Sequence, residues 1–92
     1  MKTLNEMREL VKSGKAQVLT VDKVTELKGK EISTIFFGYA GQDGVDNFIV
    51  GDIINNKLHT DEGRNTCIYT EPYANGKFWC SDDDRCVYFV EE

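Results

Sequence analysis

Hydrophobic residues along this chain follow two different periods. In the N-terminal segment they recur at helical spacing and form one apolar stripe, Leu4, Met7, Leu10 and Val11. Thr3 and Glu6 fit a capping box at the start of this stripe, and Gly14 suits the left-handed position that follows a helix. The pattern predicts a helix within residues 1–14. With about ten residues, it must pack on the rest of the chain to be stable.

The central segment, Ile32 to Ile54, has two apolar arms around Asp43-Gly44, and Asp-Gly is a strong signal for a two-residue hairpin turn. Such a turn sets a register in which the facing pairs are Gln42 with Val45, Tyr39 with Phe48, Phe37 with Val50, and Phe36 with Gly51. The aromatic pairs would stabilise the hairpin by roughly 0.2–1 kcal/mol each.

Both faces of this hairpin are apolar. One face would carry Ile35, Phe37, Tyr39, Phe48, Val50 and Ile54, and the other Ile32, Phe36, Ile49 and Ile53. A hairpin with one solvent-exposed face alternates apolar with polar residues instead. We therefore expect a central position in a rolled or layered structure. A sheet that is apolar on both sides must curl, pair with a second copy or hold a ligand, because one short helix cannot cover it.

The rest of the chain alternates short apolar runs with turn residues. Strands are expected at Ala16–Val21, Leu58–Thr60, Cys67–Tyr73, Lys77–Ser81 and Cys86–Val90. Turns are expected at Lys28–Lys30, Asn55-Asn56, Asp61–Gly63, Asn75-Gly76 and Asp82–Asp84. The segment Val24–Leu27 either continues the first strand or forms a short turn. The Asn75-Gly76 turn would pair Tyr73 with Phe78 and Pro72 with Trp79, at a sheet edge because proline cannot donate to a ladder.

These elements predict an α+β fold in one domain of residues 1–92, with a helix in 1–14 and a sheet in 16–92. The single N-terminal helix packs on a mostly antiparallel, strongly curved sheet of five to seven short strands, and a small half-open barrel is one form of it. Ninety-two residues suffice for one modest core.

Charge is unevenly placed along the chain. Residues 1–30 hold seven Lys or Arg and four Asp or Glu, a charge of +3, whereas residues 31–92 hold four and twelve, a charge of −8, which together give the formal −5. An acidic surface disfavours direct binding to nucleic acid, where phosphates need Lys and Arg. It favours a protein partner with a basic surface.

The termini and the cysteines bear on location. The N-terminal residues hold no apolar run of the signal-peptide kind, and no stretch approaches ~18 apolar residues. The chain holds three cysteines, an odd number. We therefore expect a cytoplasmic protein with reduced thiols and no membrane span.

The sequence gives little support for a metal site or a catalytic site. His59, Cys67, Cys80 and Cys86 lack the close cysteine pairs of zinc sites, and the adjacent Asp82, Asp83 and Asp84 lack the alternate spacing of a calcium loop. Whether Cys80 and Cys86 pair stays open. Asp52 would face Ile35 and be partly buried. We assign no catalytic residue, metal ligand or cofactor; a small hydrolase using His59 with a carboxylate is the least favoured alternative.

Aromatic and acidic residues give the best surface candidates. Tyr73 and Trp79 fall near the expected sheet edge, and aromatic residues beside acidic rims are typical of protein-binding surfaces. The predicted partner-binding set is Tyr73, Trp79, Asp82, Asp83, Asp84, Asp43 and Asp46.

The segment FGYAGQDGVDNFIVGDI, residues 37–53, resembles a stretch in small uncharacterised proteins on mobile elements of gut Bacteroidetes. The resemblance implies a setting in phages, plasmids or conjugative elements, where small acidic proteins often inhibit host defence or a toxin. The favoured hypothesis is a non-enzymatic module that binds a basic protein surface, with nucleic-acid mimicry as its sharper form. A ligand-binding rolled sheet is the alternative, and a homodimer would also cover an apolar face.

Overall fold

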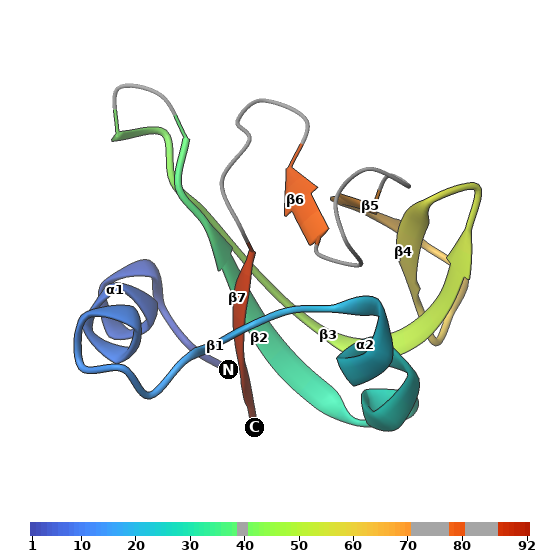
Figure 1. Ribbon diagram of the computed structural model, residues 1–92, viewed down its shortest axis with the longest axis horizontal. Helices are drawn as coiled ribbons and strands as arrows, with labels where there is room; N and C mark the ends of the chain where they lie inside the picture. The colour runs from blue at the N-terminus through green and yellow to red at the C-terminus, as the bar shows by residue number, and fades with distance from the viewer. Residues whose placement is uncertain (39–40, 71–77, 81–86) are drawn as a thin grey trace.

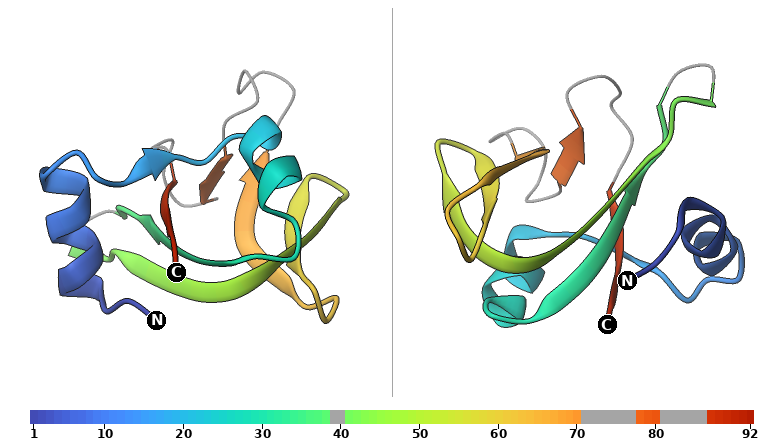
Figure 2. Two further views of the ribbon diagram at one scale, coloured as in Figure 1. Left: turned by 90° about the horizontal axis from the view of Figure 1, so that it is seen from below. Right: turned by 180° about the vertical axis from the view of Figure 1, so that it is seen from behind.

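A computed structural model of the chain describes residues 1–38, 41–70, 78–80 and 87–92 (Figure 1). Its elements in chain order are α1 (Leu4–Lys12), β1 (Gln17–Val18), α2 (Val21–Leu27), β2 (Glu31–Phe36), β3 (Gly44–Ile54), β4 (Lys57–Thr60), β5 (Asn65–Thr70), β6 (Phe78–Cys80) and β7 (Tyr88–Glu91). The strands form one antiparallel sheet in the order β1-β7-β2-β3-β4-β5-β6. The sheet curls without closing into a barrel (Figure 2). The predicted α+β class is confirmed.

Helix α1 has the two ends that the sequence predicts. The Thr3 hydroxyl accepts the Glu6 N–H at 3.2 Å, and the Glu6 carboxylate accepts the Thr3 N–H at 3.0 Å. These hydrogen bonds to Thr3 lower the pKa of Glu6. At the other end, Gly14 has a φ of 75°, and the Lys15 N–H bonds back to the Leu10 carbonyl at 2.9 Å. The helix therefore stops where its C-cap geometry requires.

Helix α2 was not predicted, so the expectation of a single helix is wrong. The Thr20 hydroxyl accepts the Lys23 N–H at 3.2 Å and begins the helix. Val24 and Leu27 share one helix face, three positions apart, and both are buried. This helix replaces the end of the expected first strand. The strand that remains is Gln17–Val18, which pairs with β7, and the Leu19 N–H also donates to the Val87 carbonyl at 2.8 Å.

Strands β2 and β3 form the expected antiparallel hairpin, but its register is different. Phe36 faces Gly44 instead of Gly51, a shift of seven positions, so the predicted pairs are wrong and the loop is longer than two residues. The Asp43 carboxylate accepts the Gly38 N–H at 3.2 Å inside this loop. The Phe36 ring occupies the space over Gly44, where a Cβ would meet it at 2.3 Å. Asp43 therefore binds within a longer loop, and Asp43-Gly44 does not form the predicted two-residue turn.

An odd shift changes which residues share a face. Ile32 pairs with Phe48 on the inner face of the curl, whereas Ile35 pairs with Val45 on the outer face. The inner face joins the main core, which consists of Leu19, Val24, Leu27, Ile32, Phe48, Val50, Leu58, Ile68, Val87 and Phe89. On the outer face, α1 packs against β2 and β3, and Met7 and Ile35 are both fully buried outside that core. The two apolar faces are thus covered by different means, one by curling and α2, and the other by α1.

A β-bulge in β3 produces part of the curl. Val50 faces Thr60 and Ile53 faces Leu58, so Gly51 and the residue after it stand opposite a single residue of β4. The extra residue brings both Val50 and Ile53 to the core side. Gly51 allows the two backbones to approach closely, because a Cβ there would lie 2.2 Å from the Thr60 carbonyl oxygen.

A second irregularity lies between β4 and β5. Lys57 faces Tyr69 but His59 faces Asn65, so the ladder is broken between these pairs. The buried Thr66 hydroxyl bridges the break: it donates to the Leu58 carbonyl at 2.9 Å and accepts the Ile68 N–H at 3.0 Å. A side chain here replaces backbone pairing that the bulge removes.

Several predicted turns are confirmed. Asn55 and Asn56 have φ values of 50° and 64° between β3 and β4, Gly29 turns at 85°, and Gly63 turns at 81°. Between β5 and β6 the expected register is wrong, since Trp79 faces Tyr69 rather than Pro72. The turns at Asn75-Gly76 and Asp82–Asp84 lie outside the described residues, as does any Cys80–Cys86 pairing.

Substituting Gly51→Ala should lower the free energy of unfolding by roughly 1–3 kcal/mol, because the new methyl group would push β4 away. Urea denaturation measures the change. Asp52→Ala is the matched control at the other position of the bulge. It removes only an exposed ion pair and should cost no more than about 0.5 kcal/mol. Equal effects of the two substitutions would contradict the close approach at Gly51.

Thr66→Val keeps the side-chain shape but leaves the Leu58 carbonyl and the Ile68 N–H without their partner. We expect a loss of roughly 1–3 kcal/mol in the free energy of unfolding. Thr25→Val is the comparison, because its hydroxyl donates to a carbonyl of an exposed helical turn. If thermal unfolding shows both variants to be equally stable, the Thr66 bridge does not hold the second irregularity together.

Candidate functional site

Much of the charge asymmetry of the sequence is used inside the molecule. Of the seven ion pairs among the described residues, five join a cation of residues 1–30 to an acid of residues 31–92. These cations are Met1 through its amino group, Lys2, Arg8, Lys28 and Lys30. The basic N-terminal third therefore neutralises part of the acidic surface that the sequence predicts for a partner.

Asp43, a predicted partner-binding residue, is committed to one of these pairs. Its Oδ2 accepts hydrogen bonds from Arg8 Nε at 3.1 Å and from a terminal guanidinium nitrogen at 2.9 Å, and only 11 % of its side chain is exposed. Its Oδ1 accepts the Gly38 N–H. Asp43 thus fastens the β2–β3 loop to α1, a structural role that leaves little of it for a partner.

Of the other predicted partner residues, only Asp46 has a side chain that the structure describes. Asp46 is half-buried and faces Thr34, so it belongs to the inner face of the sheet. Trp79 lies on β6 at the end of the strand order, which agrees with the expected edge, but its side chain is outside the described set. Tyr73, Asp82, Asp83 and Asp84 also lie outside the described residues.

A polar cluster fastens the two ends of the chain to β2 and β3. The Glu92 carboxylate binds Lys2 Nζ at 3.1 Å and the Met1 amino group at 2.9 Å, and it also accepts from the buried Ser33 hydroxyl. The Lys2 N–H donates to Asn47 Oδ1 at 2.9 Å. Hydrogen bonding to Ser33, with the two cations, lowers the pKa of Glu92 to about 2.

The outer side of β3 and β4 carries a different surface, beyond the part of the sheet that α1 covers. Ile49 and Ile54 are 36 % and 48 % exposed there. Two shallow hollows of ≈ 230 and ≈ 220 Å³ lie on this side and share Asp61 in their walls. We call this region the outer acidic surface and define it by Glu31, Ile49, Asp52, Ile54, Asp61 and Glu62.

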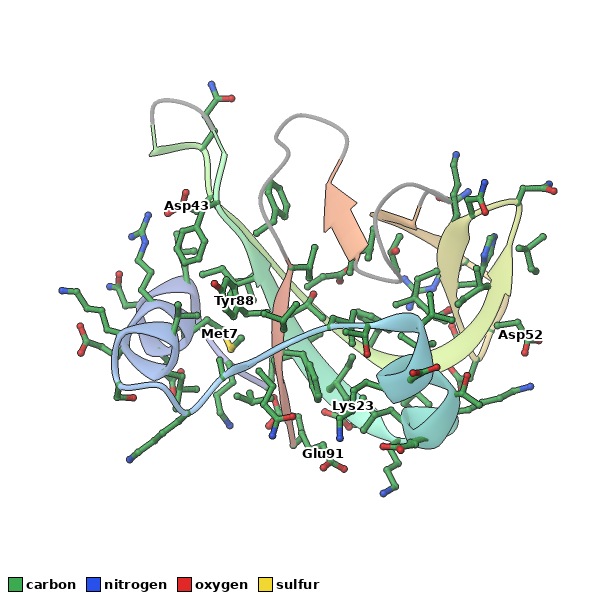
Figure 3. All side chains as sticks on the ribbon, viewed as in Figure 1. Met7, Lys23, Asp43, Asp52, Tyr88 and Glu91 are labelled. Carbon is green, nitrogen blue, oxygen red and sulfur yellow. The ribbon has the colours of Figure 1, made fainter. Side chains whose placement is uncertain are left out.

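Acids outnumber cations on this surface. Lys28 binds Asp52 at 2.6 Å and Arg64 binds Glu62 at 3.5 Å, and all four of these side chains are more than half exposed. Glu31 and Asp61 are exposed and take no part in the ion pairs found among the described residues. Asp52 is 62 % exposed, so its expected partial burial is wrong, as the altered hairpin register requires. Figure 3 shows Asp52 at the opposite end of the molecule from Asp43.

His59 lines one of the two hollows and forms no catalytic pair with any side chain that the structure describes. Its Nδ1 lies 3.1 Å from the Lys57 carbonyl oxygen. That contact fixes the imidazole by a backbone group, and no hydroxyl or thiol is bonded to His59 in the part of the chain that the structure describes. Among the same residues, no three His, Cys, Asp or Glu side chains are placed to hold a metal ion.

Comparisons of the chain with protein-family models, curated proteins and solved structures give no match. The resemblance to mobile-element proteins therefore stays an expectation. Within the described ranges, neither helix has the length and apolar composition needed to cross a membrane.

The sequence held a signal for the outer acidic surface that the hairpin prediction obscured. Glu31, Asp52 and Asp61 are separated along the chain, and only the β2–β3–β4 pairing places them in the walls of two hollows that share Asp61. Gly51, with acidic and apolar neighbours, marked the bulge. A bulge at this glycine would have put Asp52 and Ile54 on the side away from the core.

Lowering the pH from about 4.5 to about 2 should remove the stability that ionised Glu92 contributes. Its folded-state pKa of about 2 lies below the ordinary glutamate value of 4.5, so the unfolded chain takes up this proton first and stability falls as the pH falls through that window. Glu92→Gln should flatten the fall, as measured by urea denaturation at several pH values.

Ser33→Ala removes the largest cause of the lowered pKa of Glu92 and should flatten the same window partly. A Glu92→Gln protein whose stability falls with pH as steeply as that of the wild type would show that the cluster does not act in this way.

Proposed function

We propose that this chain is a non-enzymatic protein-binding module whose outer acidic surface engages a basic surface on a partner protein. The observation that supports the proposal is the exposure of Ile49 and Ile54, which line two hollows that share Asp61 and also have Glu31, Asp52 and Glu62 in their walls. Apolar residues inside a charged rim are the usual arrangement of a protein–protein contact.

Charge determines the class of partner. Glu31 and Asp61 are open to a partner's Lys or Arg, and the exposed pairs made by Asp52 and Glu62 are cheap to exchange, because surface ion pairs contribute only about 0–1 kcal/mol. A second copy of this chain would bring the same acids to the same place. The surface therefore disfavours self-association through itself and favours a basic partner, and complementary charge would mainly speed association.

The predicted acidic segment around Asp82, Asp83 and Asp84 belongs to the same hypothesis but lies outside the described residues. If the partner is a nucleic-acid-binding protein, the carboxylates would take the place of phosphates, which is the mimicry expected from the sequence. An inhibitor of host defence or of a toxin, encoded on a mobile element and acting in the cytoplasm, fits such a mode of binding.

The double substitution Glu31→Lys with Asp61→Lys should weaken capture of the partner by at least about tenfold. The experiment captures partners from the host at about 0.05 M and about 0.5 M salt, identifies them by mass spectrometry, and measures the purified pair by calorimetry. A partner bound through this surface is lost at the higher salt concentration.

Glu9→Lys with Asp22→Lys is the matched control, since both residues are exposed on the helices and the change in net charge is identical. The partner should bind this control nearly as well as the wild type. If both double variants lose partner binding equally, the effect comes from net charge alone and not from this surface. If both bind the partner as well as the wild type does, the proposed surface is wrong.

A further inference from the structure

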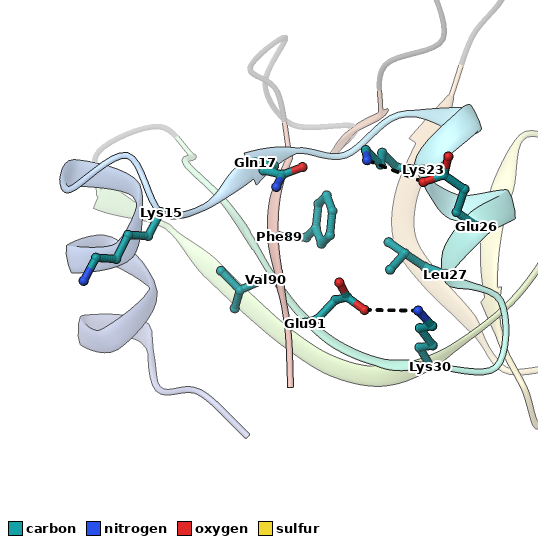
Figure 4. A pocket seen from close by; sticks show the side chains of 9 residues that line it. All are labelled: Lys15, Gln17, Lys23, Glu26, Leu27, Lys30, Phe89, Val90 and Glu91. Atoms are coloured by element: carbon teal, nitrogen blue, oxygen red, sulfur yellow. Dashed lines mark hydrogen bonds and ion pairs between the residues drawn. The ribbon is translucent and has the colours of Figure 1, made fainter.

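A second recess lies on the other side of the molecule, between α2, β1 and β7. It has a volume of ≈ 330 Å³, at the small end of the roughly 300–1,000 Å³ typical of ligand sites. Leu27 and Phe89 form its floor, and both belong to the main core. Figure 4 shows these two side chains between two ion pairs, Lys23 with Glu26 and Lys30 with Glu91. We call this recess the α2 cleft.

The two ion pairs of the α2 cleft are loose. Lys23 Nζ lies 3.4 Å from Glu26 Oε2, and Lys30 Nζ lies 3.6 Å from Glu91 Oε1, whereas strong charge-assisted pairs are roughly 2.7–2.9 Å long. All four side chains are at least 45 % exposed. Each pair can therefore exchange its partner for a ligand charge with little loss.

The cleft offers charges of both signs around an apolar floor. A purely anionic ligand would meet Glu26 and Glu91, and a purely cationic ligand would meet Lys23 and Lys30. A zwitterion satisfies both signs at once, because its carboxylate can bind the lysine of one pair while its ammonium group binds the glutamate of the same pair. An apolar side chain on the same molecule would then lie over Leu27 and Phe89.

We infer that the α2 cleft binds a free α-amino acid with an apolar side chain. The inference is independent of the outer acidic surface, since the two share no residue. Because the cleft is open and its charges are hydrated, the dissociation constant should be on the order of 1 mM.

Titration with L-leucine, followed by the amide signals in two-dimensional NMR spectra, tests the inference. Saturable shifts are expected at Gln17, Leu27 and Phe89. Isocaproate lacks the ammonium group of leucine, isoamylamine lacks its carboxylate, and glycine lacks its side chain. Each should bind at least about fivefold more weakly than leucine. Equal binding of isocaproate would show an anion site, and leucine shifts spread over the whole surface would show nonspecific contact. Either result overturns the inference.

Substitutions assign the binding to the cleft. Glu91→Gln and Lys30→Gln should each weaken leucine binding by about fivefold or more, since each removes one of the opposed charges. Lys15→Gln is the control, because Lys15 lines the cleft but its head group points away from it (Figure 4). All four of the wall charges are exposed, so the variants should fold, as their spectra will show. Unchanged binding in both cleft variants would contradict the assignment.

Discussion

The close approach of two backbones at Gly51 is the constraint on which the shape of this protein depends. With no side chain there, β4 can lie against the bulge in β3. The extra residue of the bulge changes which side chains of β3 face the core, so that Val50 and Ile53 both reach it. The break between β4 and β5, bridged by Thr66, adds a second irregularity on the other side of β4. Bulges bend a strand and increase its twist, so a sheet with two of them in succession curls around its own side chains.

The curl covers only one of the two apolar faces of the sheet. The outer face of β2 and β3 is covered by α1, whose nine residues could not hold a helix alone. Polar ties at several points keep it in place: Arg8 to Asp43, and Lys2 to both Asn47 and Glu92. Two basic residues of the N-terminal third, Lys2 and Arg8, thus serve to attach it to the sheet.

The two proposed binding regions lie where helices α1 and α2 leave parts of the sheet uncovered. Helix α1 does not reach the end of β3, so Ile49 and Ile54 remain exposed beside acids that the N-terminal cations do not fully neutralise. Helix α2, with seven residues, closes one side of the curl but leaves a recess against β7. One region has mostly one sign of charge and suits a basic macromolecule. The other has both signs and suits a small zwitterion.

The sequence by itself determined the local features, because their causes lie within a few residues. The capping box of Thr3 and Glu6, the stop at Gly14 and the Asn55-Asn56 turn could all be predicted, as could the α+β class. Tertiary structure alone decided the hairpin register and the use of the charges. Asp43-Gly44 is a good tight turn in isolation, but Asp43 instead binds Arg8, 35 residues away. The hairpin register and the bulge at Gly51 together determine which acids and isoleucines share a face, and that register joins residues that are far apart in the sequence.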